Sequence, residues 1–439
     1  MSRRQFIKNS GASTLNLIIQ FTVNFLLTGY LVSRLGATAY GFFALACTVV
    51  NYATIISNAL NSMSARFVGY EYFNNNLKGA IRYYSSVLYG DLLFVAILFL
   101  PALFLLLNID SIIDIPADLV HDVKILFFLV FLNLCVSVGG AIFSIVYVIR
   151  DRLDLSSLRE VISNLLRAAI LVALYTIFDT SIIFLGIAAL ASAIYVLTVN
   201  YFASRRLLPE IRTDFKEVRF GAIKEIAESG IWNSLNQLSI LLLHGLDLLI
   251  CNKMVSPLAM GYLSIATTLP NAVSSCISSF SYLFTPRFLE HFSHHNYVAL
   301  VADVKNSIKF MTVISCIPIT FLIGFGLPFY KLWTPSTDVH TVFILSVLVI
   351  LPNFTGAAIN SVNFLYSVAN KVKWPALVLL CTGVMNVALI FILLKVTNLG
   401  IYVIVLVSAA LGLIRNVIFN APYAAVCIKQ KFYIFYKEL

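Results

Sequence analysis

Long apolar runs, separated by short polar segments, dominate the pattern of hydrophobic and polar positions along the chain. About 20 mainly apolar residues cross a bilayer as one helix, and runs of this length give twelve candidate spans. They cover 15–33, 41–63, 83–107, 123–149, 161–178, 181–203, 229–250, 261–283, 308–330, 341–366, 375–394 and 400–427. Because the runs are continuous and do not alternate with period two, the pattern predicts an all-α polytopic membrane protein.

The composition agrees with a membrane protein. The chain has 439 residues, of which 60% are hydrophobic and 11% charged, and its mean hydropathy is +0.92. Soluble globular domains carry about 25% charged residues. The formal net charge of +10 could indicate nucleic-acid binding, but the basic residues form small clusters between apolar runs, which favours membrane topology. The seven cysteines form no CxxC pair, so we interpret them as packing residues.

The basic residues are divided unevenly between the two sides of the predicted membrane. If the segment before the first span is cytoplasmic, 23 of the 30 Lys and Arg residues lie on the cytoplasmic side and five on the opposite side, while Arg167 and Arg415 lie within spans. This asymmetry follows the positive-inside rule and predicts that both termini are cytoplasmic. The N-terminal segment has no small-residue cleavage site, so we expect the first span to be retained.

Similar short motifs recur about half a chain apart. The segment "LVSRLGATAYGFFALA" at 31–46 has a counterpart in "LICNKMVSPLAMGYLSIA" at 249–266. The matches keep the same order and the same position relative to the spans, which indicates an internal repeat. The matched pairs are Ser10-Gly11 with Ser229-Gly230 at an offset of 219, Asn16 with Asn236, Asn24 with His244, Gly41 with Gly261 and Ala46 with Ala266 at 220, and Arg66-Phe67 with Arg287-Phe288 at 221.

The repeat predicts two lobes in one orientation. Each half contains six spans, and an even number returns the chain to the side on which it started. The halves are then related by a pseudo-two-fold axis along the membrane normal. We expect an N-terminal six-helix lobe at 1–203, a C-terminal six-helix lobe with a short cytoplasmic tail at 229–439, and a cytoplasmic linker at 204–228. Alternating charges in the linker favour a partly amphipathic helix. Such a two-lobed bundle is typical of transporters.

The motifs "NSGASTLNLIIQF" and "LG-x3-YG-x2-A-x-A" at 35–46 resemble those of the bacterial polysaccharide repeat-unit flippases, especially O-antigen flippases. These belong to the multidrug/oligosaccharidyl-lipid/polysaccharide exporter superfamily. The resemblance implies transport of an undecaprenyl-pyrophosphate-linked oligosaccharide from the cytoplasmic to the periplasmic leaflet of the inner membrane, by alternating access. It also implies a polysaccharide polymerase and a chain-length regulator as partners, and no cofactor.

Polar side chains follow one face of the first span and of the seventh. Asn16, Gln20 and Asn24 recur every four residues, and the seventh span carries Asn233 and Gln237. Polar groups are costly against lipid, so these faces should meet each other or a water-filled cavity. Hydrogen bonding that only holds the bundle together is the alternative.

Charged residues within the spans are stronger signals of a site. We expect Arg34, Arg167 and Arg415 to make a cavity positive enough for a pyrophosphate or an acidic sugar, because a guanidinium binds phosphate oxygens in bidentate fashion. Arg66 and Arg287, at span ends, either border this cavity or extend toward the cytoplasmic interface. A structural alternative pairs Arg167 with the in-span carboxylate of Asp91.

Ion coupling is a further hypothesis. His244 and Asp247 lie three residues apart on one predicted helix, where a carboxylate could tune the titration of the histidine. Asp91 is a third candidate. The alternative for His244 and Asp247 is a purely structural hydrogen-bonded pair.

Other functional classes fit less well. The histidines of "EHFSHH" at 290–295 lack the HExxH pattern and no GxxxxGK[ST] motif occurs, so we expect neither a metal site nor ATP hydrolysis. A membrane glycan polymerase or ligase would need a large periplasmic loop, but the longest outer segment is 108–122. A cation-coupled multidrug or metabolite antiporter of the same superfamily is the nearest alternative, although the first span carries no acidic residue.

Overall fold

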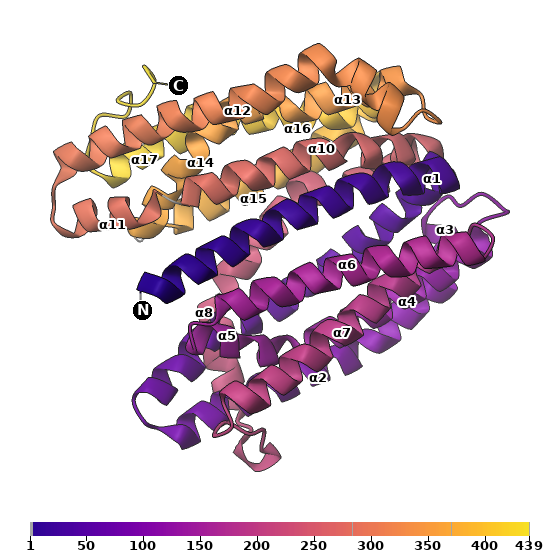
Figure 1. Cartoon of the computed structure of the whole chain (residues 1–439). Helices are drawn as coiled ribbons and strands as arrows, with labels where there is room; N and C mark the ends of the chain where they lie inside the picture. Colours follow the sequence, from indigo (N-terminus) through magenta and orange to yellow (C-terminus); the bar gives the residue numbers. More distant parts are fainter. Residues whose placement is uncertain (1–2, 283, 370, 439) are drawn as a thin grey trace. The chain divides into compact units, whose positions relative to one another are not determined.

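The computed structural model describes residues 3–282, 284–369 and 371–438, and within these residues the regular structure is entirely helical (Figure 1). The chain divides into two compact units. Unit 1 comprises 1–35 and 42–238, and unit 2 comprises 36–41 and 239–439. The lobes predicted from the sequence divide at 204–228 instead, and that division stays a prediction.

Unit 1 contains the first seven α-helices of the chain, except residues 36–41 of the first, and the beginning of an eighth. Its elements are α1 (Arg3–Phe73), α2 (Leu77–Leu107), α3 (Ile109–Ile112), α4 (Val120–Gly139), η1 (Ala141–Ile145), α5 (Val146–Ile149), α6 (Leu153–Ile177), α7 (Ile183–Leu207), η2 (Phe215–Glu217) and α8 (Phe220–Ile240) as far as residue 238. The predicted linker 204–228 comprises the end of α7, a largely irregular stretch that includes η2, and the first turns of α8.

Unit 2 contains the remaining elements. They are η3 (Leu241–Gly245), α9 (Asp247–Met254), α10 (Pro257–Tyr282), α11 (Thr285–Ser293), α12 (Tyr297–Trp333), α13 (Val339–Ile350), α14 (Asn353–Val368), α15 (Lys373–Val396), α16 (Ile401–Arg415), η4 (Asn416–Asn420) and α17 (Ala421–Cys427). Both η3 and η4 are π-helices, a form that is rare and occurs often at functional sites.

Ten helical stretches of the described residues are long and apolar enough to cross a membrane, so the chain is a polytopic membrane protein. One of them, Gly11–Phe73, is 63 residues long and contains both predicted spans 15–33 and 41–63. The predicted span 261–283 lies on α10, which is not among the ten, and its last residue lies outside the described residues. The count of twelve therefore stays a prediction.

Gly36 divides α1 into two helical segments. Its φ of 78° and ψ of 167° lie outside the helical region, and residues with a Cβ rarely adopt such a positive φ. The next residues pack closely in unit 2. A Cβ added to Gly41 would lie 2.8 Å from the Cα of Gly261, and one added to Gly261 would lie 2.3 Å from the carbonyl oxygen of Ala37. The two glycines matched in the sequence repeat are thus in backbone contact with one another.

Apolar clusters fix the helix ends in each unit. In unit 1 the buried Val68, Tyr84 and Tyr147 bring α1, α2 and α5 together, and the Tyr84 hydroxyl hydrogen-bonds Ser204 of α7 at 2.8 Å. In unit 2 the buried Phe288 and Phe435 pack with residues of α12, α14 and α17.

Candidate functional site

In unit 1, α1 and α6 lie side by side (Figure 1) and join along their polar faces. Ser13 Oγ hydrogen-bonds Ser157 Oγ at 3.2 Å, and further along both helices Arg167 Nη2 donates to Asn24 Oδ1. The partners are 144 and 143 residues apart in the sequence, so the two helices run parallel with a nearly constant register. One residue of the polar stripe predicted on the first span, Asn24, therefore contacts a polar residue of α6.

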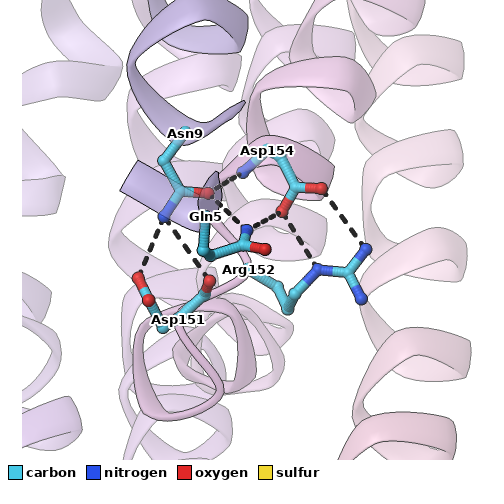
Figure 2. A network of polar contacts seen from close by, with 5 residues as sticks. All are labelled: Gln5, Asn9, Asp151, Arg152 and Asp154. Atoms are coloured by element: carbon cyan, nitrogen blue, oxygen red, sulfur yellow. Dashed lines mark hydrogen bonds and ion pairs between the residues drawn. The ribbon is translucent and has the colours of Figure 1, made fainter. Parts of the chain in front are cut away.

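Asn9 anchors the beginning of this contact (Figure 2). Its Nδ2 donates to Asp151 Oδ1 at 2.9 Å, and its Oδ1 accepts the backbone N–H of Asp154, also at 2.9 Å. Because Asp154 lies in the first turn of α6, Asn9 satisfies a helix N–H that lacks an intrahelical partner. The side chain of Asn9 is buried, so α1 itself caps α6.

Two further side chains complete the network in Figure 2. Gln5 Nε2 donates to Asn9 Oδ1 at 2.9 Å and to Asp154 Oδ1 at 3.0 Å. Arg152 binds the same carboxylate through Nε and Nη2 at 3.1 and 3.3 Å. The network holds the first turns of α1 against the turn between α5 and α6.

The other residues of the predicted stripe have different environments. Asn16 Oδ1 is buried and accepts no hydrogen bond from the described residues, whereas the Gln20 side chain is exposed. On α8, Asn233 and Gln237 are also exposed. Exposed amides on membrane helices need water or a polar ligand. Their place in the lining of a cavity stays a prediction.

Asp91 and Arg167 each have an amide partner, and the predicted alternative pairing between them stays a prediction. Asp91 is fully buried, and both of its carboxylate oxygens accept from Asn61 Nδ2 at 3.0 Å. Arg167 binds Asn24, because the parallel register of α1 and α6 brings those two residues together. Asn61, on the second segment of α1, was not among the residues selected from the sequence.

The arginines predicted at the span ends are exposed. The Arg34 guanidinium lies over the Tyr30 ring, 5.7 Å from its centroid, which is a cation–π contact. Arg66 and Arg287 are exposed without such a contact among the described residues. Their role as cavity or interface residues stays a prediction.

Arg415 is the corresponding in-span cation of unit 2. It is the last residue of α16 and directly precedes the π-helix η4. Its side chain is half-buried, and its Nη1 is buried and donates no hydrogen bond to any described residue. A buried guanidinium nitrogen without an acceptor is costly, so this position is suited to an anion.

His244 and Asp247 belong to two different helical elements, and the predicted structural pair of these residues stays a prediction. His244 lies in the π-helix η3 and Asp247 begins α9. A π-helical turn is wider than an α-helical turn, which removes the stacking of residues three apart. Next to His244, the backbone carbonyl of Leu243 accepts a hydrogen bond from Asn386 Nδ2 at 2.8 Å. A role in ion coupling is left as a prediction, as it is for Asp91.

The structure also reveals polar positions that sequence reasoning missed. On α6, polar residues recur every three or four positions from Asp154 to Arg167, a period that was visible in the sequence. On α10, Asn271, Ser275 and Ser278 are exposed, and Ser278 accepts from Asn360 of α14 at 2.9 Å. Among the described residues, no group of three or more His, Cys, Asp and Glu side chains could hold a metal ion.

The sequence is similar to that of one known membrane protein. No family model matches the sequence. The uncharacterized membrane protein EpsK of Bacillus subtilis (strain 168) is 26% identical over 452 residues, which cover 99% of this chain and 86% of that protein.

Two solved structures illustrate the similarity. An inward-facing MATE-family multidrug resistance transporter of the MOP superfamily superposes with a TM-score of 0.74 at 15% identity, over 95% of this chain and 98% of that chain. The lipid II flippase MurJ, in an inward closed conformation, gives a TM-score of 0.73 at 15% identity, over 98% and 90%. At such identities the likeness shows the fold alone, and this chain has the fold of these two solved structures.

Proposed function

We propose that the protein is a flippase that moves an undecaprenyl-pyrophosphate-linked oligosaccharide, an O-antigen or related repeat unit, from the cytoplasmic to the periplasmic leaflet. It acts by alternating access and is not an enzyme. The fold shared with a lipid II flippase supports a lipid-linked substrate, and the sequence motifs at 9–21 and 35–46 support a polysaccharide repeat unit.

The observation that carries the proposal is Arg415. Its buried Nη1 lacks an acceptor among the described residues, although a charge within a membrane protein requires a partner or water. A pyrophosphate supplies the oxygens that a guanidinium binds best. An anionic headgroup would therefore satisfy Arg415 during transport.

Arg167 supports the same proposal from unit 1. Asn24, a neutral amide, accepts a hydrogen bond from its guanidinium. At this contact the neutral acceptor orients the guanidinium and does not cancel its charge.

A cation-coupled multidrug or metabolite antiporter is the second candidate. MATE multidrug transporters share the fold equally well. The fully buried Asp91, whose only hydrogen-bond partner among the described residues is the neutral Asn61, is the specific observation in its favour. A buried carboxylate of this kind could exchange a cation during transport.

Deletion and complementation test the proposal. In cells that lack the gene, lipid-linked repeat units should accumulate on the cytoplasmic leaflet and surface polysaccharide should be lost, and the wild-type gene should restore it. Loss of drug resistance without this accumulation would favour the antiporter. Neighbouring genes for glycosyltransferases and sugar-nucleotide synthesis would favour the flippase.

A further inference from the structure

Residues 428–438, here called the tail segment, fold back onto unit 2. Lys429 has a φ of 58°, the left-handed conformation that commonly ends a helix. The backbone N–H of Gln430 donates to the Ala425 carbonyl at 2.9 Å, which closes the last turn of α17. The chain therefore reverses its direction directly after α17.

Three side chains hold the tail segment in place. Phe435 is fully buried in a cluster with Phe288 and Leu300. The Glu438 carboxylate, only 8% exposed, pairs with Lys305 of α12 at 3.2 Å. The Tyr436 hydroxyl donates to the Val417 carbonyl of η4 at 2.7 Å. The tail segment is thus part of the folded unit.

The spans predicted from the sequence put the tail segment near the edge of the bilayer. Lys305 lies three residues before the predicted span 308–330, and Val417 lies within the predicted span 400–427. A segment that touches both positions lies at the level where a membrane passes from headgroups to acyl chains, the depth typical of interfacial segments.

The exposed surface of the tail segment is aromatic and basic. Phe432 and Tyr433 are 60% and 52% exposed. Lys429, Lys431 and Lys437 are exposed, and none of them forms an ion pair within the described residues. Its one carboxylate side chain, Glu438, is already paired with Lys305, so the exposed surface carries an uncompensated positive charge.

We infer that the tail segment binds anionic phospholipid headgroups of the leaflet on the predicted cytoplasmic side. The three lysines attract phosphate groups, since basic residues beside a membrane bind acidic lipids. Phe432 and Tyr433 enter the headgroup region, which aromatic rings favour. The charge of the surface and its position at the bilayer edge select a lipid as the occupant. This inference does not depend on the transported substrate.

Native mass spectrometry of the intact protein tests the inference. The protein in detergent is mixed with phosphatidylglycerol or with phosphatidylcholine of the same acyl chains, and retained lipid is counted. Wild type should prefer phosphatidylglycerol, and K429Q/K431Q/K437Q should lose about tenfold of that preference. F432A/Y433A should retain less of both lipids.

A matched variant and a competitor make the test decisive. K78Q/K216Q/K224Q removes three exposed lysines of unit 1 and should keep the wild-type preference. Excess inorganic phosphate should leave bound phosphatidylglycerol in place. The inference is overturned if the tail variant binds like wild type, if the unit 1 variant loses as much, or if phosphate displaces the lipid. Unchanged melting temperatures would show that each variant is folded.

Discussion

Asn24 and Arg167 lie 143 residues apart in the sequence and meet between α1 and α6, where the arginine donates to the amide oxygen. The contact orients a cation with a neutral acceptor. It is a feature expected where a membrane protein must offer positive charge to a substrate.

Asn24→Asp should lower transport of an anionic substrate while leaving the protein folded. The new carboxylate would pair with Arg167 and cancel its charge at this position. We expect about a tenfold loss of transport, because a charged hydrogen bond contributes about 1.5–3 kcal/mol. Surface polysaccharide at matched protein levels measures the loss, with Ser33→Ala, an exposed position of the same helix, as control. Wild-type polysaccharide in Asn24→Asp would contradict the role of Arg167.

Asn9→Ala should destabilise unit 1. The substitution removes the cap of α6 and the hydrogen bond to Asp151, and the loss of such a cap costs about 0.5–2 kcal/mol. Thermal unfolding in detergent should show a lower melting temperature. Asn74→Ala, at an exposed turn residue, is the control and should melt close to wild type. Equal melting of the two variants would show that the network in Figure 2 contributes little.

Gly261→Ala should destabilise the protein because its Cβ would lie 2.3 Å from the Ala37 carbonyl oxygen. Overpacking of this kind costs about 1–3 kcal/mol. Gly412→Ala in α16 is a matched helical control, since a Cβ there meets nothing within 4 Å, and it should be neutral or stabilising by about 0.4–1 kcal/mol. If both variants unfold at the same temperature, the close contact of Gly261 with Ala37 is not required for stability.

Asp338 should contribute a pH-dependent part of the stability. Hydrogen bonds from the Thr341 hydroxyl and backbone N–H hold the pKa of this carboxyl below its ordinary value of 3.8. A group with a lowered folded-state pKa stabilises the protein above its unfolded-state value, and the contribution is lost as the pH falls through the folded-state pKa. The melting temperature of Asp338→Asn should therefore be lower than that of wild type at pH 6. The two melting temperatures should converge as the pH falls below 3.8. A difference in melting temperature that stays constant across that range would show that ionisation of Asp338 does not contribute to stability.

Much of the fold could be predicted from the sequence, because the apolar runs and the demand of a bilayer leave helices as the main solution. The break between the spans 161–178 and 181–203 is confirmed, since α6 ends at Ile177 and α7 begins at Ile183. A division between the predicted spans 15–33 and 41–63 is also present, because the backbone of Gly36 interrupts the helical conformation of α1.

The site was less predictable, because side-chain partners depend on the register between helices. The polar stripe of the first span was visible, but Arg167 could be matched with Asn24 only after the parallel pairing of α1 and α6 was known. Likewise, His244 lies in the π-helix η3, and a local insertion of this kind leaves no periodic signal.

Flipping in reconstituted vesicles tests the central claim most directly. Vesicles containing the purified protein and lipid-linked oligosaccharide from the producing cells are treated with a membrane-impermeant glycosidase. With wild-type protein, essentially all of the glycan should become accessible, and Arg415→Ala should slow this at least about tenfold while Arg415→Lys retains part of the activity. If the inner-leaflet half stays protected with wild-type protein, the flippase account is contradicted.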